Sequence, residues 1–158
     1  MILLSIDPGF ERLGLAIIQK ESRGKEMLMY SECFKTSPKL PHEERLRLIG
    51  NKITDVIKTY KPTELATEKL FFTSNQKTVI PVAEARGVIL FIAGTHNLKV
   101  SEYSPPQIKV AVTGYGRSDK TQIMAMIPRL ITLIKPIKSD DEFDAIAIGL
   151  THCAISRV

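Results

Sequence analysis

Cysteine is scarce in this sequence. Cys33 and Cys153 are the only two among 158 residues, and neither belongs to a Cys-x-x-Cys pair or a Cys/His cluster. A disulfide-stabilised scaffold and a structural zinc site are therefore not expected. This sparse use of cysteine is typical of the reducing cytoplasm, where we expect the protein to reside.

Long apolar runs are also missing. No segment reaches the length of a membrane span, so no membrane partner is expected. The first residues, MILLSIDPG, lack the positively charged region and the cleavage site of a signal peptide, and are predicted to form a strand. Internal repeats, low-complexity tracts and linkers are absent as well. Residues 1–158 are therefore predicted to form one domain, which is long enough for a hydrophobic core.

Positive charge is in modest excess. The net charge is +5 and the isoelectric point is about 9.2, which permits a polyanionic partner without requiring one. The basic residues gather at Lys109, Arg117 and Lys120, whereas the acids gather at a few isolated points. A protein that binds nucleic acid and a divalent metal would show this pattern, and so would many ordinary basic proteins.

Hydrophobic periodicity predicts three leading strands, followed by helices that alternate with further strands. This order predicts an α/β fold with a five-stranded mixed sheet flanked by helices on both faces. Pro128 is predicted to stop the next-to-last helix. The predicted strands are 2–7, 13–20, 26–36, 63–68 and 98–103, and the predicted helices are 41–60, about 75–96, 105–113, 121–127 and one from about 140.

Acidic residues crowd the start of the last predicted helix, KSDDEFDAIAIGLTHCA (138–154). Ser139 and Glu142 fit a capping box, and acids in the first turn favour the positive end of the helix dipole. Asp141 and Asp144 are three residues apart and share a helix face that points toward packed structure. Two inward carboxylates repel each other unless a cation or a proton joins them. On spacing alone, capping and metal binding are equally favoured.

Two more carboxylates stand at strand ends. Asp7 closes the first strand and Glu68 closes the fourth, and sites in α/β sheets form at such ends. Asp7 also fits the start of a turn before Pro8, and Glu68 also fits the surface of an edge strand. If these two converge with Asp141 and Asp144, the cluster requires a cation. Hard carboxylate oxygens suit Mg²⁺ or Mn²⁺, and two such ions promote phosphodiester hydrolysis.

Five segments, in this order and at these separations, carry a family resemblance. They resemble the RuvC family of Holliday-junction resolvases over nearly the whole chain. The resemblance implies a ribonuclease-H-like fold, a homodimer, and paired symmetric nicks in four-way DNA junctions with Mg²⁺. It also suggests a branch-migration helicase as a partner. The segments are IDPGFERLGLAII, ATEKLFF, AEARGVIL, YSPPQIKVAVTGYGRSDKTQI and DEFDAIAIGLTHC.

The resemblance assigns the catalytic metal ligands. The family's first aspartate falls on Asp7, its strand-end glutamate on Glu68, and its helical Asp-x-x-Asp pair on Asp141 and Asp144. The stretch before this pair differs from the family, so a slip of one residue would make Asp140 the ligand. Asp141 is favoured because its spacing to Asp144 keeps both on one face.

The resemblance also implies DNA contacts. The family's wedging aromatic matches Phe71, although a core position is the alternative for this side chain. The basic residues near the scissile phosphate match Lys109 and Lys120, and Lys109 also fits a solvated helix position. Further candidate DNA contacts are Asn75, Lys77, Arg86 and Arg117. For Arg86, a structural role and DNA contact are equally open.

The sequence therefore predicts an endonuclease that resolves four-way DNA junctions, with Lys120 offsetting charge in the transition state. A branched-DNA-binding protein with a silent site and a ribonuclease-H-like nuclease with another substrate are the alternatives. An actin-like ATPase or sugar-kinase module is disfavoured, because such proteins need a second domain to close over ATP and 158 residues leave no room for it.

Overall fold

The computed structural model describes residues 1–21, 24–70 and 76–156 of the chain. The elements in chain order are β1 (Ile2–Asp7), β2 (Arg12–Gln19), β3 (Glu26–Lys35), α1 (His42–Tyr60), β4 (Glu64–Glu68), α2 (Gln76–Thr95), β5 (Lys99–Tyr103), α3 (Pro105–Thr113), α4 (Lys120–Leu130), β6 (Ile131–Thr132) and α5 (Asp140–Ile155). The three leading strands and the later alternation agree with the sequence pattern.

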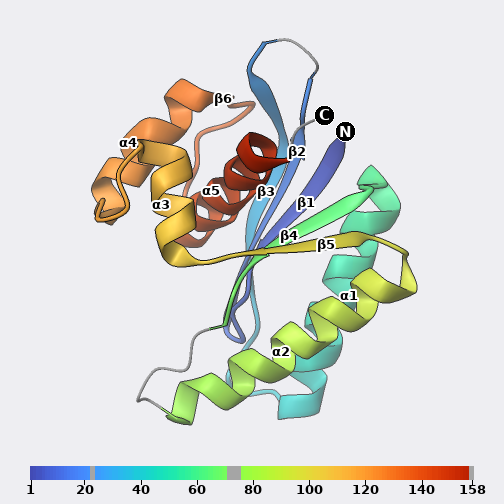
Figure 1. The fold of residues 1–158 in the computed structure, drawn as a ribbon. Helices are drawn as coiled ribbons and strands as arrows, with labels where there is room; N and C mark the ends of the chain where they lie inside the picture. The colour runs from blue at the N-terminus through green and yellow to red at the C-terminus, as the bar shows by residue number, and fades with distance from the viewer. Residues whose placement is uncertain (22–23, 71–75, 157–158) are drawn as a thin grey trace.

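A mixed sheet forms the centre of the molecule (Figure 1). Within the described residues its strand order is β5-β4-β1-β2-β3-β6. The first three strands form antiparallel hairpins, whereas β1, β4 and β5 run parallel to one another. The sheet is therefore mixed, as predicted.

The predicted number of strands is wrong by one in the described part of the chain, which has six. Ile131 and Thr132 follow α4 directly and pair in parallel with the start of β3. A two-residue strand carries no alternation of its own, so only the tertiary pairing reveals it.

The predicted stop at Pro128 is also wrong, because α4 continues through it to Leu130. Proline removes a single backbone donor, and its position near the end of the helix limits that loss. The last turn is still closed, since the Ile131 N–H donates to the Ile127 carbonyl.

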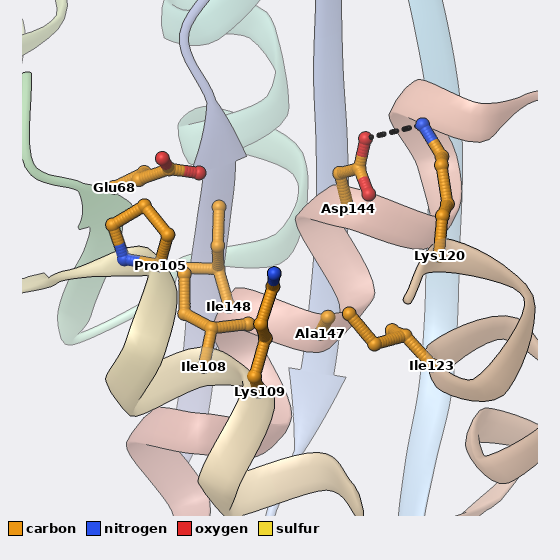
Figure 2. A pocket seen from close by; sticks show the side chains of 9 residues that line it. All are labelled: Glu68, Pro105, Ile108, Lys109, Lys120, Ile123, Asp144, Ala147 and Ile148. Atoms are coloured by element: carbon orange, nitrogen blue, oxygen red, sulfur yellow. Dashed lines mark hydrogen bonds and ion pairs between the residues drawn. The ribbon is translucent and has the colours of Figure 1, made fainter. Parts of the chain in front are cut away.

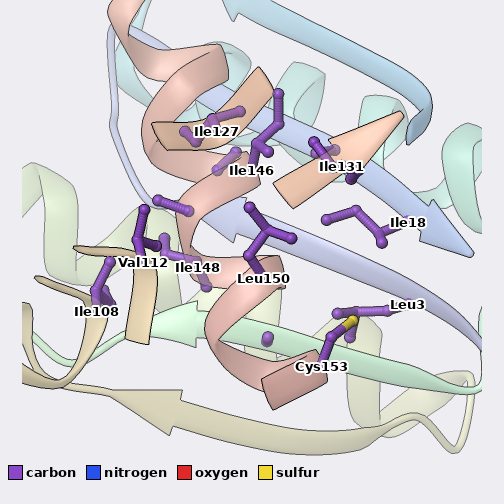
Figure 3. Packing of buried hydrophobic residues seen from close by; sticks show 14 of the residues in the cluster. Leu3, Ile18, Ile108, Val112, Ile127, Ile131, Ile146, Ile148, Leu150 and Cys153 are labelled. Atoms are coloured by element: carbon purple, nitrogen blue, oxygen red, sulfur yellow. The ribbon is translucent and has the colours of Figure 1, made fainter. Parts of the chain in front are cut away.

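Helices cover both faces of the sheet (Figure 1). Alternate residues of each strand point to opposite faces, so the core is divided in two. One half packs α1 and α2 against the sheet, and it includes Leu4, Ile6 and Leu65. The other half packs α3, α4 and α5 against the sheet, and Figure 3 shows Leu3, Ile18 and Leu150 within it. None of the helices in the described ranges is long and apolar enough to cross a membrane.

Two glycines let α5 lie directly on the sheet. A Cβ added to Gly149 would come within 2.7 Å of the Ser5 hydroxyl oxygen on β1. A Cβ added to Gly14 on β2 would come within 2.9 Å of the Asp141 carbonyl carbon. Because these contacts involve backbone and short side chains, they fix the distance between α5 and the strands beneath it.

Candidate active site

The ends of β1 and β4 bring two carboxylates side by side. These strands are parallel neighbours with Ile6 opposite Thr67, so Asp7 and Glu68 follow at the same edge of the sheet. Both lie on the face that α5 covers, because Leu3 of β1 and Ala66 of β4 pack in that half of the core and lie an even number of residues away. The strand-end placement predicted from the sequence is therefore observed.

The first turns of α5 supply the other carboxylates. The Ser139 hydroxyl accepts a hydrogen bond from the Glu142 backbone N–H at 3.3 Å, which caps the helix. The Glu142 side chain does not complete the predicted capping box. It is buried, where it accepts from the Ser31 hydroxyl at 2.6 Å and pairs with the Lys135 ammonium at 3.1 Å. Glu142 thus anchors the start of α5 to β3.

Burial and mutual repulsion disfavour the charged forms of three of these acids. Burial, followed by the charges of Asp144, Glu68 and Asp141, raises the pKa of Asp7 to about 7. Burial and the Asp144 charge raise the pKa of Glu68 as well. The pKa of Asp144 is raised by burial, which outweighs the opposing effect of Lys120. A cation at this edge of the sheet would relieve all three.

Asp141 is held by protein donors. Its Oδ2 accepts from Arg12 Nε at 2.9 Å, from Arg12 Nη2, and from Cys33 Sγ at 3.4 Å. Burial alone would raise the pKa of Asp141, but the hydrogen bonds from Arg12 and Cys33 outweigh it and lower the pKa. Asp140 faces solvent, with 62% of its side chain exposed against 19% for Asp141. Of the two acids, Asp141 is the one whose charge helps to raise the pKa of Asp7.

Two lysines lie beside these acids and line a surface hollow. Lys120 is the first residue of α4, and its Nζ lies 3.0 Å from Asp144 Oδ2 and 3.3 Å from Asp140 Oδ2. The capping box of Asp119 and Gln122 fixes this end of α4 and therefore the position of Lys120. Lys109 reaches the hollow from α3, across from Glu68 (Figure 2).

The hollow is a cavity of about 280 Å³ with charged groups above an apolar base. Its charged lining is Glu68, Lys109, Lys120 and Asp144, and its apolar lining is Pro105, Ile108, Ile123, Ala147 and Ile148. A neighbouring cavity of about 320 Å³ contains Asp7 and shares Glu68 and Pro105 with the first. Glu68 and Pro105 therefore border two neighbouring hollows, one lined by Asp144, Lys109 and Lys120 and the other by Asp7.

The donor set suits a hard divalent cation. All four candidate ligands are carboxylates, which favour Mg²⁺ or Mn²⁺ over metals that prefer sulfur or imidazole. In the part of the chain that the structure describes, no group of three or more His, Cys, Asp or Glu side chains is placed to hold an ion. Two of the acids are occupied instead, Asp141 by Arg12 and Asp144 by Lys120. The residues fit the ion in charge and donor type, and these ion pairs must open to admit it.

A family model for the crossover junction endodeoxyribonuclease RuvC matches residues 3–152. The chain belongs to the RuvC family. RuvC of Halothermothrix orenii is 41% identical, over 96% of this chain and 92% of its own. RuvC of Desulforamulus reducens is 40% identical, over 96% of this chain and 93% of its own. RuvC nucleases are metal-dependent, which agrees with the carboxylate cluster.

Solved RuvC structures have the same fold. The Thermus thermophilus RuvC structure superposes with a TM-score of 0.89 at 32% identity, covering 98% of this chain and 94% of that chain. T. thermophilus RuvC in complex with a Holliday junction substrate gives a TM-score of 0.90 at 32% identity, covering 96% and 92%. The predicted ribonuclease-H-like fold is confirmed by these similarities.

The other residues predicted from the RuvC resemblance differ in their exposure and contacts, and some lie outside the described residues. Arg86 on α2 forms an ion pair with Glu102 on β5. Arg117 is exposed in the connection between α3 and α4. Phe71 and Asn75 lie outside the described residues, as does the side chain of Lys77.

Arg12 and Cys33 were not predicted as site residues. Gly14 is the central residue of a row across the sheet, opposite Asp7 on one side and Cys33 on the other. Arg12 lies two residues before Gly14 and therefore faces α5 with it. The alternation of β2 could have indicated that face, but the pairing with Asp141 depends on the tertiary position of α5.

Proposed function

We propose that this RuvC-family chain is a structure-specific endonuclease that resolves four-way DNA junctions by paired symmetric nicks in homologous recombination and repair. Residues 1–158 would act as one nuclease domain in the cytoplasm. What supports the proposal is the placement of Asp7 and Glu68 at neighbouring strand ends, on the face covered by α5, whose first turns carry Asp141 and Asp144 beside Lys120. The T. thermophilus relative, whose structure contains a Holliday junction substrate, supports this choice of substrate.

Asp7, Glu68, Asp141 and Asp144 would hold Mg²⁺ or Mn²⁺, with two ions per site. Bound ions of this kind supply an activated water and stabilise the leaving oxygen of a phosphodiester. Asp7 and Glu68 orient the site from the rigid sheet, whereas Asp141 and Asp144 orient it from the capped helix. Both supports fix the backbone of these residues, so the side chains of Asp141 and Asp144 need only leave Arg12 and Lys120 to hold an ion.

Lys120 and Lys109 would bind the scissile phosphate. Both line the hollow that holds Glu68 and Asp144, so their ammonium groups lie beside the proposed point of attack. Positive charge at that point stabilises the extra negative charge that develops in the transition state. Burial alone would lower the pKa of Lys120, but its pairing with Asp144 and Asp140 raises the pKa, so the lysine stays charged.

Outside the chemical centre, we assign DNA contact to Phe71, Asn75, Lys77, Arg86 and Arg117. Phe71 would stack on bases at the junction centre, as aromatic side chains do in single-stranded nucleic-acid sites. Arg117, exposed near the start of α4, would contact the phosphate backbone. Such contacts recognise the shape of the backbone before the base sequence. A branch-migration helicase would deliver the junction.

A homodimer would place two such sites for cuts in opposed strands. One face of α2 provides the support, because its exposed residues follow the 4-3-4-3 spacing of a helix-packing seam. Phe91 is 74% exposed and Ile80 is 62% exposed, which is unusual for side chains of this size. Added Cβ atoms at Gly87 and Gly94 would meet open space, so a second helix could approach closely there. This α2 seam consists of Ile80, Glu84, Gly87, Phe91 and Gly94.

Cleavage of a labelled four-way junction tests the proposal. Wild type with Mg²⁺ should produce paired, ligatable nicks, whereas Asp7→Asn and Asp144→Asn should bind the junction without cutting it. Asp141→Asn should also lose cutting. Asp140→Asn is the matched control and should keep it, because Asp140 is mostly exposed.

Other outcomes would select an alternative function. Binding of the junction by wild type without cutting, in both Mg²⁺ and Mn²⁺, would favour a silent branched-DNA-binding protein. Cutting of an RNA–DNA hybrid in preference to the junction would favour a ribonuclease-H-like nuclease with another substrate. Equal binding to a junction and to linear duplex would contradict junction recognition altogether.

A further inference from the structure

The Arg12–Asp141 pair occupies a proposed metal ligand with a group from the protein itself. Arg12 is the first residue of β2 and faces α5, and its Nε and Nη2 both donate to Oδ2 of Asp141. Cys33 Sγ donates to the same oxygen from β3 at 3.4 Å. Three donors therefore converge on one carboxylate oxygen, which leaves little lone-pair capacity there for a cation.

Positive charge is shared unequally among the acids. Asp141 has a guanidinium partner and a lowered pKa, whereas Asp7 and Glu68 have raised pKa values because burial and neighbouring acids disfavour their charged forms. A divalent cation that joined all of them would need Asp141 to turn toward Asp7. Among the described residues, no three acidic side chains are placed to hold an ion together. The hydrogen bonds from Arg12 explain why Asp141 is not one of such a group.

We propose that Arg12 is a resident counterion that a divalent cation must displace from Asp141 before the site can load. This inference rests on the proposed function, because it takes Asp141 as a metal ligand. Arg12 is able to leave, since 49% of its side chain is exposed and its long stem can swing into water. In the metal-free protein Arg12 limits the repulsion among the acids, and in the loaded protein that role passes to the ion.

A purely structural ion pair would behave differently. If Arg12 only fixed the geometry of Asp141, removing it would misplace a ligand, and the metal affinity would fall. If Arg12 competes with the ion, removing it frees Oδ2 and makes the local field more negative, so the metal affinity rises. The direction of the change in affinity therefore separates the two roles.

The test is titration of Mn²⁺ into the metal-free protein without DNA, following free Mn²⁺ by its electron paramagnetic resonance signal. Arg12→Gln should bind Mn²⁺ about threefold more tightly than wild type, which is the scale of one partly exposed ion pair. Arg12→Lys keeps the positive charge but lacks the two N–H donors of the guanidinium, so its Mn²⁺ affinity should lie between those of Arg12→Gln and wild type. Arg47→Gln is the matched control, because Arg47 makes a similar pair with Glu44 on α1, and it should match wild type.

Cleavage at varied Mg²⁺ gives a second readout, in which the half-saturating concentration should fall about threefold for Arg12→Gln. Equal or weaker Mn²⁺ binding by both Arg12 variants, with folding confirmed by circular dichroism, would overturn the displacement of Arg12. If wild type cut junctions and bound Mn²⁺ normally, the proposed function would survive that result. If wild type bound no Mn²⁺ at all, both proposals would fail together.

Discussion

The Asp141 carbonyl group lies against the backbone of Gly14, so closely that a Cβ on the glycine would stand 2.9 Å from the carbonyl carbon. The same Cβ would lie 3.1 Å from the Cβ of Asp7. The absence of a side chain at Gly14 thus permits the first turn of α5 to reach the strand that carries Asp7. This contact between a strand and a helix sets the separation of the proposed metal ligands.

Substituting Gly14 with alanine should therefore disturb both stability and activity. The added methyl group forces the start of α5 away from β2, and overpacking of this kind costs about 1–3 kcal/mol in the free energy of unfolding. Urea denaturation of the metal-free protein measures the loss. Asp55→Ala on the exposed face of α1 is the control and should not destabilise, because its side chain lies in solvent and alanine favours a helix. Equal stability of Gly14→Ala and wild type would contradict the close packing.

The raised pKa of Asp7 predicts that the metal-free protein loses stability as the pH rises. Well below pH 3.8, which is its ordinary pKa, the carboxyl is protonated in both the folded and the unfolded state. Between that value and its folded pKa of about 7, the unfolded chain ionises while the folded one stays protonated, so unfolding becomes easier. Above about pH 7 both states are ionised and the effect levels off.

Asp7→Asn should lack this pH dependence. Measured in chelator from pH 4 to pH 8, its advantage in unfolding free energy over wild type should grow up to about pH 7 and then stay constant. Asp55→Asn, an exposed substitution on α1, should follow the wild-type profile. A constant difference between Asp7→Asn and wild type over the whole range would refute the shifted pKa.

Removal of the Lys120 charge should slow cleavage much more than it weakens binding. Lys120→Gln takes away a cation beside Asp144, and loss of one such transition-state contact costs about 10²–10³ in rate. Single-turnover cleavage of a bound junction measures that rate, and gel-shift titration measures affinity. Lys58→Gln on the exposed face of α1 is the control. A fall in affinity at an unchanged single-turnover rate would assign Lys120 to binding alone.

A charge in the α2 seam should separate the proposed dimer. Phe91→Lys replaces a 74% exposed aromatic ring with an ammonium that repels its symmetry mate across a twofold interface. Sedimentation velocity should then show a monomer, and junction cutting should change from paired nicks to single ones. Tyr115→Lys, another exposed aromatic position, should leave the oligomeric state as in wild type. A dimer that persisted in Phe91→Lys would place the interface elsewhere.

The carboxylates at the strand ends were predictable because both strands are short and clearly bounded. Asp7 ends the apolar run of β1 and Glu68 ends β4, and parallel pairing of the two strands brings these residues to one edge. Local pattern was sufficient for the strands themselves and for the acidic helix. The resemblance to a known family then indicated which of the acids belong together.

Features that depend on tertiary pairing were not predictable in the same way. Glu142 has the spacing of a capping residue, but Ser31 and Lys135, distant in sequence, draw its side chain into the interior. Ile131 and Thr132 form a strand only because β3 offers an open edge. Arg12 reaches Asp141 across 129 positions of sequence, a contact that no local spacing encodes.

The packing of α5 against the sheet also limits where residues can be inserted into this chain or deleted from it. Ser139 begins the helix and Gly149 holds it against β1, so the number of residues between Asp144 and Gly149 sets the direction in which Asp141 and Asp144 point. One residue inserted between Asp144 and Gly149 would rotate both acids by about 100° relative to Gly149. An insertion among residues 133–138 would leave their direction unchanged. Insertions and deletions among relatives should therefore accumulate before the serine and be excluded after it.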